Sequence, residues 1–122
     1  MSRDITGLAE IDQALDALRM ISALRSQGRQ AFEDSQERQH SAAYLWIVVG
    51  SALKQFCRLR GIGQGSSPFP GPIGMRDRLC YASPRDLSAS ILWETCDKDT
   101  DDLMAVLLDV RSGLMAGERP TA

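Results

Sequence analysis

Apolar side chains return every three or four residues along three long segments of this chain, and that spacing restricts the fold more than any other feature. In the first segment the apolar stripe consists of Ile5, Leu8, Ile11, Leu15, Leu18, Ile21 and Leu24. Positions three and four apart lie on one face of an α-helix, so the spacing predicts a helix over about residues 4–25. Gly28 is expected to end this element, with Ala31 and Phe32 in a short turn.

The second segment is predicted to be a helix that begins near Asp34 or Ser35, ends at Arg60 and is stopped by Gly61. Its inward face is expected to carry Ala42, Leu45, Trp46, Val49, Leu53, Phe56 and Leu59. Residues 44–49 are rich in β-formers and could alone be a strand. The helical spacing on both sides and the lack of turn residues favour the helix.

Glycine and proline dominate residues 61–72, which predicts a loop. It is not a domain linker, because neither side is large enough to form a stable domain alone. A short helix is expected over about residues 72–81, and the segment from Ser83 to Asp86 is expected to break it.

The third long helix should follow an N-cap at Asp86 or Ser88 and end before a frayed tail at residues 117–122. Its inward residues are expected to be Ile91, Leu92, Thr95, Leu103, Val106, Leu107, Val110 and Leu114. No segment requires a strand. The sequence therefore predicts a single all-α domain over residues 1–122, an up-and-down helical bundle of three long helices plus one short helix.

Composition narrows the classes of function. With 14 basic and 16 acidic side chains, a formal charge of -2 and a pI near 5.3, the chain does not coat nucleic acid through bulk positive charge. Cys57, Cys80 and Cys96 form no CxxC pair and have no neighbouring histidine, so they are expected to be reduced thiols, and no metal site is predicted.

No cofactor is predicted either, because the glycines of the loop follow no strand and precede no Gly-Lys-Ser/Thr, as a phosphate-binding loop would. The longest apolar run, residues 42–49, is too short to span a bilayer, and the first residues lack the apolar core of a signal peptide. We therefore expect a cytoplasmic protein without a membrane partner.

Charge is segregated along the chain. Between residues 54 and 85 the charged residues are Lys54, Arg58, Arg60, Arg76, Arg78 and Arg85 against Asp77 alone. Between residues 91 and 111 they are Glu94, Asp97, Asp99, Asp101, Asp102 and Asp109 against Lys98 and Arg111. Two interpretations stay open: two solvated faces that complement each other, or arginines placed to contact phosphates, which their planar guanidinium groups suit.

Two motifs carry a resemblance to a known family. Residues 74–79 read Gly-Met-Arg-Asp-Arg-Leu, residues 93–95 read Trp-Glu-Thr, and the long helix over residues 39–52 contains Gly50. In these motifs and their order, the sequence resembles the HepT-like branch of the HEPN superfamily, which are helical-bundle proteins encoded beside minimal nucleotidyltransferases in prokaryotic toxin-antitoxin pairs. The resemblance implies a HEPN-like bundle, a homodimer, a minimal nucleotidyltransferase antitoxin as partner, and RNA as ligand.

The resemblance also implies where a site would lie. The family carries Arg-x4-His-x-Tyr on the short helix, where the arginine and histidine form a metal-independent ribonuclease centre across a dimer interface and the tyrosine can be adenylylated by the nucleotidyltransferase. In this chain Arg76 occupies the arginine position, but Tyr81 stands at the histidine position and Ser83 at the tyrosine position. The RNA-facing arginines would be Arg76, Arg78 and Arg85.

Loss of the histidine matters chemically, because only histidine has an unperturbed pKa near neutrality. Tyrosine, with a pKa near ~10, is a poor base, and losing general acid–base assistance costs about 10²- to 10⁴-fold in rate. The main expectation is therefore a degenerate HepT-like protein with weak or no ribonuclease activity. Two alternatives remain: a non-catalytic module that binds a nucleotidyltransferase, and a ribonuclease that combines Arg76 with another acid–base group.

Individual residues also have structural interpretations. His40 is expected to face solvent on the polar first turns of its helix. Arg76 could instead pair with an acid on a neighbouring helix, such as Glu94, and Trp46 and Trp93 are expected in the core or in a dimer interface. Tyr81, at a helix end, could accept adenylylation in place of the family tyrosine.

Overall fold

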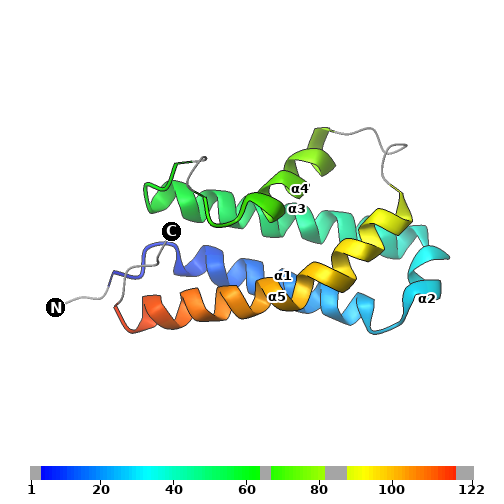
Figure 1. Cartoon of the computed structure of the whole chain (residues 1–122), viewed down its shortest axis with the longest axis horizontal. Coiled ribbons are helices and arrows are strands. Elements are labelled where there is room, and N and C mark those ends of the chain that lie inside the picture. The colour runs from blue at the N-terminus through cyan, green and yellow to red at the C-terminus, as the bar shows by residue number, and fades with distance from the viewer. Residues whose placement is uncertain (1–3, 64–66, 82–87, 118–122) are drawn as a thin grey trace.

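The computed structural model describes residues 4–63, 67–81 and 88–117, and the described part is helical, with no strand. The helices are α1 (Leu8–Arg25), α2 (Arg29–Glu33), α3 (Gln36–Leu59), α4 (Pro70–Tyr81) and α5 (Ala89–Met115). Helix α1 packs against both α3 and α5, whereas α4 packs on α3 (Figure 1). The all-α bundle is thereby confirmed.

Local chemistry sets the ends of the long helices. Ser35 and Ser88 are the N-caps of α3 and α5, and their hydroxyls accept the N–H groups of Arg38 and Ile91. At the other end of α3, Gly61 adopts φ 69°, and Ile62 N–H donates to the Cys57 carbonyl at 2.8 Å. This pair of features is a Schellman motif, in which a left-handed glycine satisfies the last helical carbonyls.

The core lies where α1 meets α3 and α5. Its fully buried side chains include Ile11, Leu15, Leu18, Ile21, Trp46, Leu53, Phe56 and Leu107. The Trp46 indole N–H donates to Cys96 Sγ at 3.4 Å, and the Trp93 ring packs on Phe32 with a centroid distance of 5.7 Å. Both tryptophans are therefore core residues, and all three cysteines are free thiols.

Three expected boundaries need correction. Helix α1 begins at Leu8 rather than near residue 4, because the Asp4 carboxylate accepts the Thr6 N–H and Gly7 turns the chain at φ 89°. The expected turn at Ala31 and Phe32 is the five-residue helix α2, which adds a fifth helix. Helix α4 begins two residues early, at Pro70, since proline fits the first helical turn, where no N–H is needed.

The predicted inward faces of the helices were wrong for four residues at their edges. Ile5, Leu59, Ile91 and Val106, all expected to point inward, are 43–48% exposed. The buried stripe of α5 instead runs through Leu92, Trp93, Cys96, Thr100, Leu107 and Leu114. Thr100 tolerates burial because its hydroxyl donates to the Cys96 carbonyl at 2.6 Å. In the described part of the chain, no helix is long and apolar enough to cross a membrane.

Candidate functional site

Helix α4, which carries the motif at residues 74–79, lies unusually close to α3. A Cβ atom at Gly50 would stand 2.6 Å from the Pro72 carbonyl oxygen and would overlap the Arg76 side chain. Only glycine at position 50 therefore lets the two helices approach this closely. The phenylalanine that precedes α4, Phe69, is buried and packs edge-on against Phe56 at 6.2 Å between ring centroids.

The close approach of the two helices positions the aliphatic part of the Arg76 side chain, and hydrogen bonds hold its guanidinium group. Its Nε donates to Ser51 Oγ of α3 at 3.1 Å, and its Nη1 donates to Asp77 Oδ1 at 2.8 Å. The Lys54 Nζ lies 3.7 Å from the same Asp77 oxygen. The hydrogen bond from Arg76, assisted by the Lys54 charge, lowers the pKa of the Asp77 carboxyl below its ordinary value.

Of the other predicted site residues, the structure describes the side chain of Arg78 alone. Arg78 is exposed on α4, one turn beyond Met75. Tyr81 is the last residue of α4, but its side chain lies outside the described residues, as do Ser83 and Arg85. Of the expected RNA-facing arginines, the structure thus places Arg76 and Arg78 on one short helix.

His40 is exposed on the second turn of α3, as expected. It precedes Ser51, the α3 contact of Arg76, by eleven residues of continuous helix, about 16 Å along the axis at 1.5 Å per residue. That separation exceeds the reach of an imidazole. Within one chain, His40 and Arg76 therefore do not form a joint catalytic pair.

The acidic residue proposed as a structural partner of Arg76 has other contacts. Glu94 pairs with Arg29 of α2 at 3.0 Å and with Lys98 of its own helix at 2.7 Å. Lys98 and then Arg29 lower the pKa of the Glu94 carboxyl. Arg76 instead meets the carboxylate next to it in the sequence, Asp77, so the expected Glu94 pairing was wrong in its partner.

Further ion pairs join α5 to α1. Asp101 accepts from Arg25 at 2.9 Å, and Arg111 donates to Asp12 at 2.7 Å. Together with the pair of Glu94 and Arg29, these contacts direct charges of α5 toward α1 and α2. The charge segregation seen in the sequence is therefore partly neutralised on the side of α5 that faces away from α4.

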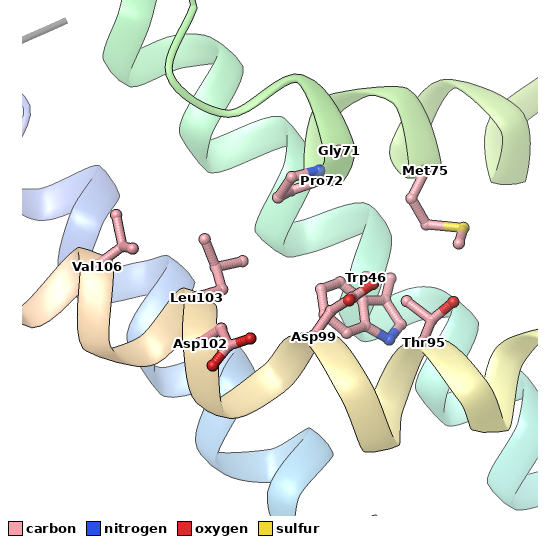
Figure 2. Close-up of a pocket in the computed structure, with 9 residues that line it drawn as sticks. All are labelled: Trp46, Gly71, Pro72, Met75, Thr95, Asp99, Asp102, Leu103 and Val106. Atoms are coloured by element: carbon pink, nitrogen blue, oxygen red, sulfur yellow. The ribbon is translucent and has the colours of Figure 1, made fainter.

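A groove lies between α4 and α5, with α3 beneath it. Its cavity of about 330 Å³ is lined by Trp46 from α3, by Gly71, Pro72 and Met75 from α4, and by Thr95, Asp99, Asp102, Leu103 and Val106 from α5. Figure 2 shows the Met75, Leu103 and Val106 side chains directed into the space between the helices, and the Asp99 and Asp102 carboxylates at its α5 side.

The groove was not expected from the sequence, although several of its residues stand out there. Met75 belongs to the motif, and Thr95, Leu103 and Val106 were expected to point inward. The available signal was a second apolar stripe on α5, offset from the core stripe. Which stripe is covered depends on how α5 packs against α1 and α3, and helical spacing alone does not determine that packing.

A second cavity, of about 300 Å³, lies on the opposite side of α4. Its wall includes Lys54, Cys57 and Arg58 of α3 and Ile73 and Asp77 of α4.

The described residues contain no group of three histidine, cysteine, aspartate or glutamate side chains that could hold a metal ion. Comparisons with family models, curated proteins and solved structures found no match to this chain.

Proposed function

We propose that this protein is a HEPN-type helical bundle of a toxin-antitoxin type system that acts by binding RNA and has weak or no ribonuclease activity. The proposal rests on the resemblance at residues 74–79 and 93–95 and on the surroundings of Arg76. In the described structure its partners include Ser51 and Asp77, and neither group exchanges protons near neutral pH.

Metal-independent cleavage of RNA needs a base to take a proton from the 2′-hydroxyl group and an acid to protonate the leaving oxygen. Asp77 is a weak base here, because its pKa is lowered further by the bond to Arg76. The only histidine of the chain, His40, lies far along α3. The observation that carries the proposal is therefore that the two described hydrogen-bond partners of Arg76, a serine and an aspartate, are poor proton carriers near neutral pH.

Binding a phosphate group requires no general acid or base, in contrast to cleavage of RNA. Arg78 is exposed on α4, two positions from the anchored Arg76 and therefore on the other side of the helix, and Arg85 follows α4 in the sequence. Arginine forks pair bidentately with phosphate oxygens, so Arg78 would contribute one phosphate contact from α4. Because Asp77 offsets part of this charge, we expect modest affinity that falls steeply with salt.

The first test measures cleavage of tRNA and mRNA in EDTA by the parent protein and by Arg76→Ala and Tyr81→His variants. We expect weak or no cleavage by the parent, and a gain of activity in Tyr81→His if the histidine alone has been lost. Strong cleavage by the parent that disappears in Arg76→Ala would contradict the proposal, since the family chemistry would then persist without its histidine.

The second test measures binding of fluorescein-labelled single-stranded RNA by anisotropy between about 50 and 200 mM salt. Arg78→Ala should weaken binding several-fold and reduce the salt dependence, because one phosphate contact is lost. Arg19→Ala, which removes an exposed arginine from α1, is the matched control and should bind as the parent does. Equal affinities of all three proteins would place RNA elsewhere or exclude it.

A second candidate function is a non-catalytic module that binds a minimal nucleotidyltransferase. It is favoured by the half-exposed apolar residues of α5 in the groove, such as Val106 at 47%. Copurification of the two coexpressed proteins in the absence of RNA would support it. A homodimer is expected under both functions, and a monomer in light scattering at micromolar concentration would contradict a site shared between subunits.

A further inference from the structure

Helix α5 presents a second face that the bundle leaves uncovered. Ile91, Thr95, Asp99, Asp102 and Val106 follow one another at steps of four, four, three and four, so they share one side of the helix. Ile91 and Val106 are 43% and 47% exposed, although helical spacing marks both as inward-facing. A helix face that carries half-exposed apolar residues at both ends and is covered by no other described element is a candidate for contact with another molecule.

The groove beside this face is bounded by residues of three helices. Its floor is the side of Trp46, one wall is Pro72 and Met75 of α4, and the other is Leu103 and Val106 of α5. From Thr95 to Val106 it follows α5 for eleven residues, about 16 Å or three helical turns. An elongated apolar groove of this length suits the apolar side of a short amphipathic helix.

The acidic side chains at the groove favour a positively charged partner. Two other carboxylates of the same stretch of α5 are already paired, Glu94 with Arg29 and Lys98, and Asp101 with Arg25, whereas Asp97 is exposed outside the groove. Asp99 and Asp102 line the groove, are exposed and form no ion pair within the described part of the chain. They stand one helical turn apart, so they complement lysine or arginine residues spaced three or four positions apart on a partner.

We propose that the groove between α4 and α5 binds an amphipathic helix of another protein, with its apolar residues against Met75, Leu103 and Val106 and its basic residues paired with Asp99 and Asp102. The inference rests on the second candidate function, the protein-binding module, and it names the site and the chemistry of the partner. It does not depend on the RNA-binding function.

The test uses a fluorescein-labelled synthetic peptide of 14 residues, about four helical turns, with leucine on one face and lysine on the other. A matched peptide carries glutamate in place of lysine. Anisotropy titrations should show saturable binding of the lysine peptide and at least tenfold weaker binding of the glutamate peptide, since rim charges select the partner.

Variants then locate the binding site. Val106→Lys places a like charge in the groove and should weaken the lysine peptide at least tenfold. Asp99→Asn/Asp102→Asn should weaken it roughly three- to tenfold, because two exposed ion pairs are lost. Asp16→Asn/Asp97→Asn removes the same charge from exposed positions outside the groove and should bind as the parent does. Circular dichroism confirms that each variant is folded.

Three results would overturn the assignment. Unchanged peptide affinity in all groove variants would place the peptide elsewhere. A parent dimer that Val106→Lys converts to a monomer would make a second copy of this chain the occupant. If a coexpressed nucleotidyltransferase copurifies equally well with parent and Val106→Lys, the partner-binding function stands and the groove assignment fails.

Discussion

Gly50 is the residue on which the contact between α3 and α4 depends. A side chain there would overlap Arg76 and the Pro72 carbonyl, and backbone atoms cannot rotate away as a flexible side chain can. We predict that Gly50→Ala lowers the free energy of unfolding by about 1–3 kcal/mol, the usual effect of overpacking, despite the better helix propensity of alanine. Urea denaturation followed by circular dichroism measures it.

Gly74 supplies the control, because it lies inside α4 and a Cβ atom added there would have nothing within 4 Å. Gly74→Ala should therefore raise the free energy of unfolding by about 0.5–1 kcal/mol through helix propensity alone. If both alanine variants were stabilised equally, the helices would not be as close at Gly50 as described.

Asp77 makes the anchoring of Arg76 dependent on pH. Its pKa is lowered in the folded state, first by the hydrogen bond from Arg76 and further by the charge of Lys54. A lowered folded-state pKa gives stability that is present above the ordinary value of 3.8 and is lost as the pH falls through the lower folded-state value. We predict that Asp77→Asn unfolds with a flatter dependence on pH below about 4 than the parent.

Urea midpoints between pH 3 and 6 check this prediction. Above pH 5 the parent should be the more stable protein, and the difference should shrink as the pH falls. A constant difference between the two proteins over the whole interval would show that the Asp77 carboxylate does not gain from its contact with Arg76 and Lys54.

At the scale of elements, the two long helices that follow loops depend on serine caps. Ser35 Oγ accepts the Arg38 N–H at 3.2 Å, and Ser88 Oγ accepts the Ile91 N–H at 3.1 Å. Ser35→Ala and Ser88→Ala should each lower the free energy of unfolding by about 1 kcal/mol, whereas aspartate at either position should retain the cap. Ser112→Ala, at an exposed position inside α5, is the control.

Chemical denaturation of these variants distinguishes a cap from a neutral surface serine. Equal stability of Ser88→Ala and Ser112→Ala would contradict the capping role of Ser88. The aspartate variants matter for the same reason, because their carboxylates also accept an N–H and favour the positive end of the helix dipole.

The caps show why the element boundaries could be predicted. The helix ends at Ser35, Ser88 and Gly61 depend on hydrogen bonds between residues three to five positions apart. They can therefore be predicted from the local sequence. The early start predicted for α1 failed for a related reason. Gly7 turns the chain at φ 89°, a conformation that an apolar period through Ile5 does not reveal.

The inward face of α5 could be predicted only in part, because two apolar stripes lie side by side on that helix. Leu92, Leu107 and Leu114 are buried in the core, while Ile91 and Val106 are half exposed. Spacing identifies both stripes, but the packing of α5 against α1 and α3 decides which one is covered. The same reasoning applies to the site: Arg76 could be placed on a short helix, but its contact with Ser51 depends on the fold.

For the whole molecule, the packing divides the bundle into a central part and an attached helix. Helices α1, α3 and α5 share the large buried side chains, with α1 between the other two. Helix α4 packs mainly on α3, and within it only Leu79 is buried among the described side chains. Few buried contacts give a helix a low free energy of local opening.

Native-state hydrogen exchange should therefore separate α4 from the rest of the bundle. We predict that α4 amides exchange through an opening with a lower free energy than the one that exposes the amides of α1 and the middle of α3. Gly50→Ala should speed exchange in α4 before it affects α1, because the substitution acts on the contact between α3 and α4. Protection of α4 equal to that of α1 would show that the bundle opens as one unit. An attached α4 would also let the groove widen without unfolding α1, α3 or α5, which is what a docking helix needs from one wall of its site.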